Sequence, residues 1–209
     1  MKKNNLENHK IKKFIAALIS TFFSPLLIFA ATIIILSITK TTNITQAWIP
    51  ALAALFFLIG IPGITILILF KKRLVHDIHL HHRKDRQIPL LITVISALAG
   101  LIILTSQNAP QYLLVITATV FLNTLILWIV TFYWKISIHA ATLAVAITIF
   151  AFVYNPIVLI LYFLLIFVGW SRVYRKRHTW KQVVVGAILA ILVTIAVFNM
   201  YGYGVWGLQ

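Results

Sequence analysis

Long apolar runs separated by short polar segments dominate the pattern of this chain. A helix crosses a bilayer with about 20 predominantly apolar residues, and several runs approach that length. The pattern predicts helices over residues 14–39, 47–70, 88–105, 111–133, 136–152, 156–170 and 183–201. The expected fold is therefore an all-α, polytopic transmembrane helical bundle of about seven helices.

Prolines mark the places where these helices bend or end. Pro25, Pro50 and Pro62 lie in or near the first two predicted helices, where we expect kinks or helix boundaries. The turn at residues 154–156 divides the short fifth and sixth helices, and Pro156 suits a first helical position, where an N–H would have no partner. The number of crossings depends most on this pair.

The composition supports a membrane location. Hydrophobic residues fill 62% of the 209 positions and charged residues only 10%, which is too little polar surface to cover a soluble fold of this size. The net charge of +15 does not indicate a nucleic-acid partner, because the basic residues lie in short loops between apolar runs. The absence of cysteine excludes disulfides and thiol chemistry.

The basic residues also predict an orientation. Seven crossings place the N-terminus and three later polar segments on one face, which holds every lysine and arginine except Lys40. Because basic loops stay in the cytosol, we expect this face to be cytoplasmic and the C-terminus to lie outside. Residues 1–13 are expected to form a basic N-terminal tail, and residues 14–209 a single transmembrane domain with a retained first helix.

All seven histidines fall on this same predicted face, and two of them occupy informative positions. His139 follows Lys135 and Ser137 at the start of the fifth predicted helix, where backbone N–H groups and the helix dipole favour an anion. Lys135 as a marker of the membrane edge, with His139 as a hydrogen-bonded histidine of the bundle, is an equally simple interpretation. His178 follows Ser171 and Arg172 in a basic segment between two apolar helices, where an anchor for topology would need only positive charge.

Three blocks of sequence, taken in order, resemble a known family. The blocks are residues 77–89 (DIHLHHRKDRQIP), 135–140 (KISIHA) and 171–182 (SRVYRKRHTWKQ). They resemble the motifs Lys-x6-Arg-Pro, Pro-Ser-Gly-His and Ser-Arg-x5-His-x3-Asp of the type 2 phosphatidic acid phosphatase superfamily, the membrane lipid phosphatases related to the vanadium haloperoxidases. The order and the sidedness of the blocks both match, and the third block is the most specific.

The resemblance implies phosphoryl transfer without a metal or other cofactor, through a phosphohistidine. By position, His178 would be the nucleophile and His139 the general acid that protonates the leaving oxygen. Basic and hydroxyl side chains would hold the phosphate. The candidates from the motifs are Arg86, Arg172, Ser137 and Ser171, and charge and position alone add Arg83 and Lys135.

The chain departs from the family pattern in each block. His79 replaces the lysine and Gln87 the proline of the first motif, and β-branched Ile138 replaces the glycine of the second, which disfavours a positive φ there. Gln182 stands where the family has the aspartate that orients the nucleophile. If a carboxylate supports His178, Asp77 or Asp85 of the first basic loop must supply it, and we hypothesise Asp77.

The four histidines of the first basic loop resemble a metal cluster superficially. They are His76, His79, His81 and His82. We interpret them as parts of a solvated basic loop, because a loop so rich in cations repels a divalent ion and lacks the spacing of a closed site. No metal site is expected.

The sequence leaves several functions open. The first is a phosphatase acting on a lipid phosphate, such as phosphatidate or a polyprenyl phosphate, with membrane lipids as partners. The second is a catalytically impaired relative that binds anionic lipid head groups, which Gln182 and Ile138 favour. The third is a membrane cytochrome with His139 and His178 as haem ligands. A transporter ranks below these because no predicted helix places a charge at mid-membrane depth. The oligomeric state is not determined by the sequence.

Overall fold

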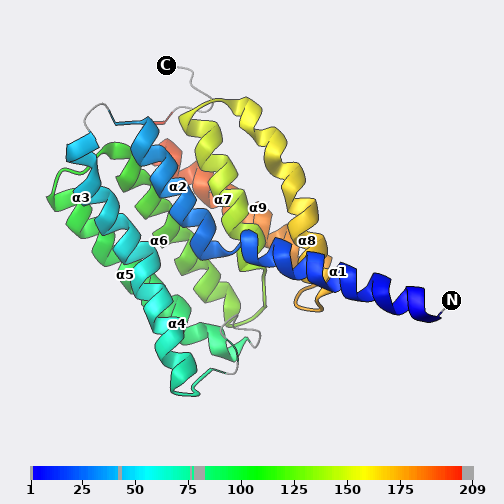
Figure 1. The fold of residues 1–209 in the computed structure, drawn as a ribbon. Coiled ribbons are helices and arrows are strands. Elements are labelled where there is room, and N and C mark those ends of the chain that lie inside the picture. Colours follow the sequence, from blue (N-terminus) through cyan, green and yellow to red (C-terminus); the bar gives the residue numbers. More distant parts are fainter. Residues whose placement is uncertain (1, 42–43, 76, 78–82, 204–209) are drawn as a thin grey trace.

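The computed structural model describes residues 2–41, 44–75, 77 and 83–203, and these form a helical bundle (Figure 1). In chain order the helices are α1 (Lys2–Phe22), α2 (Pro25–Thr39), α3 (Ile44–Leu55), η1 (Phe56–Gly60), α4 (Ile61–Lys71), η2 (Lys84–Arg86), α5 (Gln87–Ser106), α6 (Gln111–Thr131), α7 (Ile138–Val153), η3 (Pro156–Phe163), α8 (Leu164–Tyr174) and α9 (Trp180–Met200). The described residues contain no strand. The predicted all-α class is confirmed.

The number of membrane crossings is close to the predicted seven but not fixed at it. Among the described residues, five helical segments are long and apolar enough to span a bilayer, and six if the bent pair α1 and α2 counts as one span. The remaining predicted crossing is α7, which has only 16 residues. Residues 140–149 of α7 are all buried, so this helix is enclosed by its neighbours along most of its length.

Prolines shape the first two spans as expected. The helix predicted over residues 14–39 begins earlier, at Lys2, and is interrupted at Ser24, whose extended backbone precedes Pro25 in the first turn of α2. The two parts are bent by 44°. In the second span Pro50 lies inside α3, and Pro62 lies in the first turn of α4, directly after the π-helical turn η1. Pro50 therefore lies within a continuous helix, whereas Pro62 lies at the start of a new one.

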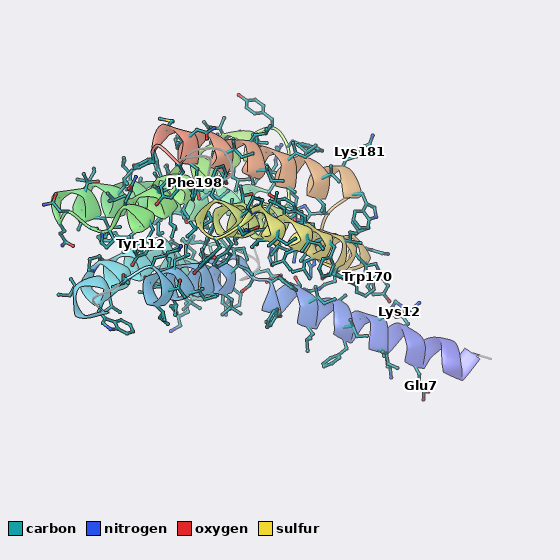
Figure 2. All side chains as sticks on the ribbon, turned by 90° about the horizontal axis from the view of Figure 1, so that it is seen from above. Glu7, Lys12, Tyr112, Trp170, Lys181 and Phe198 are labelled. Atoms are coloured by element: carbon teal, nitrogen blue, oxygen red, sulfur yellow. The ribbon has the colours of Figure 1, made fainter. Side chains whose placement is uncertain are left out.

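The bundle has two chemically different ends (Figure 2). We call the end with Lys12, Trp170 and Lys181 the basic end, because Figure 2 shows these three residues on the opposite side of the bundle from Tyr112 and Phe198. The basic end also contains the connections from α4 to α5, from α6 to α7 and from α8 to α9 (Figure 1). Three loops far apart in the sequence therefore meet at one end of the bundle.

The opposite end is held by aromatic and polar contacts. The Tyr112 hydroxyl lies 3.2 Å from the Thr41 hydroxyl. Lys40 is the one lysine that the sequence places away from the other basic residues. Its Nζ lies 4.6 Å from the centre of the Tyr154 ring. This end therefore has its one described lysine packed against an aromatic ring, and the remaining cations lie elsewhere.

A glycine lets α9 approach the loop before α7. A Cβ added at Gly186 would lie 3.1 Å from the Ser137 carbonyl oxygen and 3.3 Å from its nitrogen. One turn earlier in α9, the Gln182 carbonyl accepts a hydrogen bond from the Ser137 N–H, at 3.1 Å. The absence of a side chain at Gly186 therefore brings the start of α7 against the start of α9, the two elements that carry His139 and Gln182.

Candidate functional site

His178 lies in the turn between α8 and α9. α8 ends at Tyr174, and Lys176 then adopts a positive φ of 54°, which reverses the chain. The backbone N–H of His178 donates to the Arg172 carbonyl at 3.3 Å, so the turn folds back onto the last turn of α8. The His178 side chain is only 7% exposed. The turn between α8 and α9 thus places a buried imidazole at the basic end.

The hydrogen bonds of Gln182 determine which ring nitrogen of His178 carries the proton. Gln182 Oε1 accepts from the Thr179 backbone N–H at 3.1 Å, in a capping box at the start of α9. The same Oε1 lies 3.2 Å from His178 Nδ1, so Nδ1 must be the donor to this oxygen. In the neutral ring Nε2 then carries the lone pair, and Arg86 Nη2 lies 3.3 Å from it. The imidazole is held in the tautomer whose Nε2 is nucleophilic.

Arg86 reaches this site from the end of η2, just before α5. Its side chain is 2% exposed, and Nη1 donates to the Ile136 carbonyl at 3.0 Å while Nη2 contacts His178. Ile136 belongs to the loop between α6 and α7, so one guanidinium joins all three loops of the basic end. A buried guanidinium interacts strongly with a phosphate oxygen that comes within hydrogen-bonding distance.

Burial, together with neighbouring cations, keeps His178 neutral. Burial is the main cause that lowers the pKa of His178 from 6.5 to about 3. Three nearby cations lower that pKa further, namely Arg86, Arg172 and Lys135, while the hydrogen bond to Gln182 acts in the opposite direction. At neutral pH the ring is therefore unprotonated at Nε2.

Lys135 adds a cation whose charge is also disfavoured. Its Nζ donates to the Arg177 carbonyl at 2.9 Å, which links the α6–α7 loop to the α8–α9 turn. Burial, followed by repulsion from Arg86, Arg172 and Arg177, lowers the pKa of Lys135 to about 8. Lys135 and the neighbouring arginines thus repel one another, and a bound anion would reduce this repulsion.

Arg172 lies in the last turn of α8. It is 2% exposed, and its Nη1 donates to the Ser20 hydroxyl of α1 at 2.5 Å. Its Nε has no hydrogen-bond partner in the structure. The adjacent Ser171 donates to the Ala16 carbonyl of α1 at 2.6 Å and is fully buried. Arg172 is therefore fixed at one nitrogen and unsatisfied at another.

A cavity of about 420 Å³ extends into the bundle from Arg86 and Arg172, and His178 is not among the residues that line it. Arg86, Arg172 and His139 line it at helix ends that belong to the basic end, and most of its other lining side chains are apolar. Leu58 and Val120, near the middle of their spans, line its deeper part. The cavity combines cationic groups at the basic end with an apolar interior, as an amphipathic anion would require.

The other residues predicted for the site differ in their burial and contacts. Ser137 is the N-cap of α7, fully buried, and its hydroxyl accepts from the Ala140 N–H at 3.5 Å. Arg83 is exposed and donates to the Tyr133 carbonyl at 2.8 Å. The charge of Asp77 favours the charged form of Arg177, so Asp77 lies near the α8–α9 turn. His76, His79, His81 and His82 fall outside the described residues.

Residues 115–206 match the model of the PAP2 superfamily. Over this range the chain is similar to the PAP2 superfamily. Members of the PAP2 superfamily are generally phosphatases, which relates this chain to phosphatases. Searches of curated proteins and of solved structures return no match.

The PAP2 match covers the second and third blocks of the sequence but not the first. It therefore includes His139, Arg172, His178 and Gln182, whereas Arg86 precedes the matched range. The contact between Arg86 Nη2 and His178 Nε2 places the first block beside the third in space. Ile138, in the position of the family glycine, is not among the residues with positive φ, as its β-branched side chain predicts.

Sequence reasoning missed two parts of this site. Ser20, the partner of Arg172, lies 152 positions away along the chain, in a helix where the sequence indicated no residue of the site. The Ile136 carbonyl is a backbone group, and its residue type carries no sign of the bond from Arg86. Neither partner has a local sequence signal, because only the packing of the helices creates these contacts.

Proposed function

We propose that this protein is a membrane-embedded phosphatase that hydrolyses the phosphomonoester or diphosphate of a lipid. The observation that carries the proposal is the cavity whose polar lining, the cations Arg86 and Arg172 with His139, continues into an apolar interior. A phosphate group would bind the guanidinium groups, and the lipid chain would occupy the apolar part or the surrounding bilayer. The match of residues 115–206 to a superfamily of phosphatases supports the same function.

The buried cations supply the affinity for phosphate. Arg86, Arg172 and Lys135 are oriented by the neutral acceptors Ile136 O, Ser20 Oγ and Arg177 O. Transfer of charged groups out of water is costly unless an opposite charge compensates, so a phosphate would stabilise the site that it enters. Arginine forks also match the oxygens of a phosphoryl group during transfer. The phosphate would therefore bring an opposite charge beside these cations.

In the proposed reaction, His178 Nε2 attacks the phosphorus atom. A nitrogen–phosphorus bond forms while the bond from phosphorus to the lipid oxygen breaks, and that oxygen takes a proton from His139. Water then attacks the phosphohistidine and gives its proton to His139, and cleavage of the nitrogen–phosphorus bond releases inorganic phosphate. Gln182 keeps the proton of His178 on Nδ1, and Asp77 as a supporting carboxylate remains a hypothesis.

The orientation of the site determines the source of its substrate. The lysines and arginines other than Lys40 gather at the basic end, which by the positive-inside rule faces the cytoplasm. We infer that the protein is a multi-pass protein of the cell membrane and that its substrate comes from the inner leaflet. A reporter fused to the C-terminus would then be active only in its extracytoplasmic form, and a cytoplasmic reporter signal would reverse the orientation.

One observation favours a second function, the binding of anionic lipid head groups without turnover. The group that accepts the proton of His178 Nδ1 is the neutral amide of Gln182 rather than a carboxylate. A neutral acceptor orients the ring but does not stabilise the positive charge that develops on it during attack. In this alternative the protein keeps its phosphate-binding site but does not hydrolyse the bound lipid phosphate.

Turnover separates the two functions. We expect the purified protein in detergent to release inorganic phosphate from phosphatidate or a polyprenyl phosphate in the presence of a chelator. A short-chain phosphate ester of the same head group is expected to react with a kcat/KM about tenfold or more lower, because it forfeits apolar burial in the cavity. Phosphate binding without release from any lipid phosphate would instead establish the binding function, and equal rates for both ester classes would exclude a role for the apolar cavity.

The pKa of Lys135 predicts how phosphate affinity depends on pH. Above its pKa of about 8, Lys135 loses its charge in the free protein, so the dissociation constant for inorganic phosphate should rise by about tenfold as the pH increases through that value. Calorimetric titration over this range tests the expectation. Lys135→Arg should flatten the profile because arginine stays charged, and Lys40→Arg at the opposite end should leave it unchanged. The same rise in Lys135→Arg would assign the effect to another group.

A further inference from the structure

α1 has two different faces along the segment that packs against α8. One face is exposed and apolar, as expected for contact with lipid, and it comprises Ile11, Phe14, Ile15, Leu18 and Phe22. The other face includes Ala16 and Ser20, both buried. Figure 1 shows α1 crossing beside the lower part of α8 before the chain turns into α2. The buried face therefore meets the segment of α8 that contains Ser171 and Arg172.

Two hydrogen bonds connect this face of α1 to consecutive residues of the candidate site. Ser171 donates to the Ala16 carbonyl at 2.6 Å, and Arg172 Nη1 donates to the Ser20 hydroxyl at 2.5 Å. Thr21 and Ser24, which follow Ser20 at one and four residues along the chain, line the same cavity as Arg172. The end of α1 is therefore part of the wall of the cavity as well as a neighbour of α8.

The choice of nitrogen bound by Ser20 is informative. A guanidinium offers paired donors along two edges, and the side edge consists of Nε and Nη2. Ser20 engages Nη1 and leaves this side edge intact, and Nε is a buried donor without a hydrogen-bond partner. A buried unsatisfied donor is costly, and a phosphate oxygen pair matches such an edge in a bidentate manner. Arg172 is thus bound to Ser20 through Nη1, while Nε on its side edge has no hydrogen-bond partner.

We propose that Ser20 is a positioning residue of the phosphate site, which fixes Arg172 so that Nε and Nη2 receive the phosphate. This proposal rests on the proposed function and extends the site to α1, outside the range matched by the family. It assigns to the first helix a role in substrate affinity rather than only in membrane anchoring. Ser20 itself does not contact the reacting atoms.

The test compares Ser20→Ala and Ser20→Thr in the full-length protein in detergent. Removal of a hydrogen bond to a charged group should raise the dissociation constant for inorganic phosphate and the KM for a lipid phosphate by about tenfold, with a smaller change in kcat. Ser20→Thr retains the hydroxyl and should restore both values. Ser37→Ala is the matched control, because Ser37 is buried in α2, lacks a hydrogen-bond partner and does not line the cavity.

A double-mutant comparison tests whether Ser20 acts through Arg172. In an Arg172→Ala background, Ser20→Ala should cause no further loss of phosphate affinity. An unchanged phosphate dissociation constant in Ser20→Ala, or a full additional loss in the Arg172→Ala background, would overturn the proposal. Because phosphate binding is measured without turnover, a protein that binds phosphate but hydrolyses no lipid phosphate refutes the phosphatase function alone. A protein that does not bind phosphate refutes both.

Discussion

Replacement of His178 by alanine is expected to reduce phosphate release by at least about 10³-fold, because the loss of an enzyme's nucleophile removes the covalent route entirely. Phosphate binding should persist, since Arg86 and Arg172 remain and Arg86 Nη2 is freed from its contact with the ring. Steady-state release from a lipid phosphate and calorimetric phosphate titration measure the two effects separately.

His9→Ala is a suitable control for the loss of a histidine from this protein. His9 is exposed and its Nδ1 lies 3.1 Å from the Tyr174 hydroxyl, outside the cavity. Its replacement should leave the rate of release close to that of the unmodified protein. A His178→Ala protein that retains the normal rate while remaining folded would remove His178 from the reaction.

Replacement of Gln182 by glutamate is expected to increase kcat by about 10 to 100-fold, part of the ~10⁴ that a comparable aspartate contributes in serine proteases. Glutamate has the length of glutamine, so its oxygen can still accept from His178 Nδ1 and from the Thr179 N–H. The added negative charge raises the pKa of His178 from about 3 and stabilises the positive ring that forms during attack.

Gln182→Ala provides the opposite change at the same position. It removes both accepted hydrogen bonds, so kcat should fall because neither the ring tautomer nor the start of α9 is then fixed. Single-turnover measurements under saturating substrate give the relevant rate for each variant. A folded Gln182→Glu protein with an unchanged or lower kcat would show that charge beside Nδ1 does not limit the reaction.

The sequence predicted the fold well because apolar run length is a direct consequence of bilayer thickness. The runs located the spans, and Pro25 and Pro62 marked a break and a helix start. The start of α1 at Lys2 was not predicted, because the polar residues before residue 14 have no apolar periodicity to reveal a helix. The short helix α7 was predicted over residues 136–152, but its enclosure by other helices, with residues 140–149 all buried, is not evident from composition.

The site was predictable only where chemistry and spacing are local in the chain. The spacing from Ser171 and Arg172 to His178 and Gln182 spans the end of α8 and the start of α9, and the structure brings these residues together. The bond from Arg172 to Ser20 joins segments with no shared pattern. The proton position on His178 likewise depends on a capping interaction of Thr179 that becomes evident only once the start of α9 is known.

The central claim, that His178 carries the phosphoryl group, is tested most directly by rapid quenching of the protein with a lipid phosphate, followed by intact-mass and fragmentation analysis. We expect a fraction of the protein to gain one phosphoryl group on His178, stable in alkali and lost in acid as a nitrogen–phosphorus bond should be. The His178→Ala protein should gain none. Steady release of phosphate with no phosphoryl group on His178 at any quench time, or with the group on another residue, would contradict the proposed mechanism.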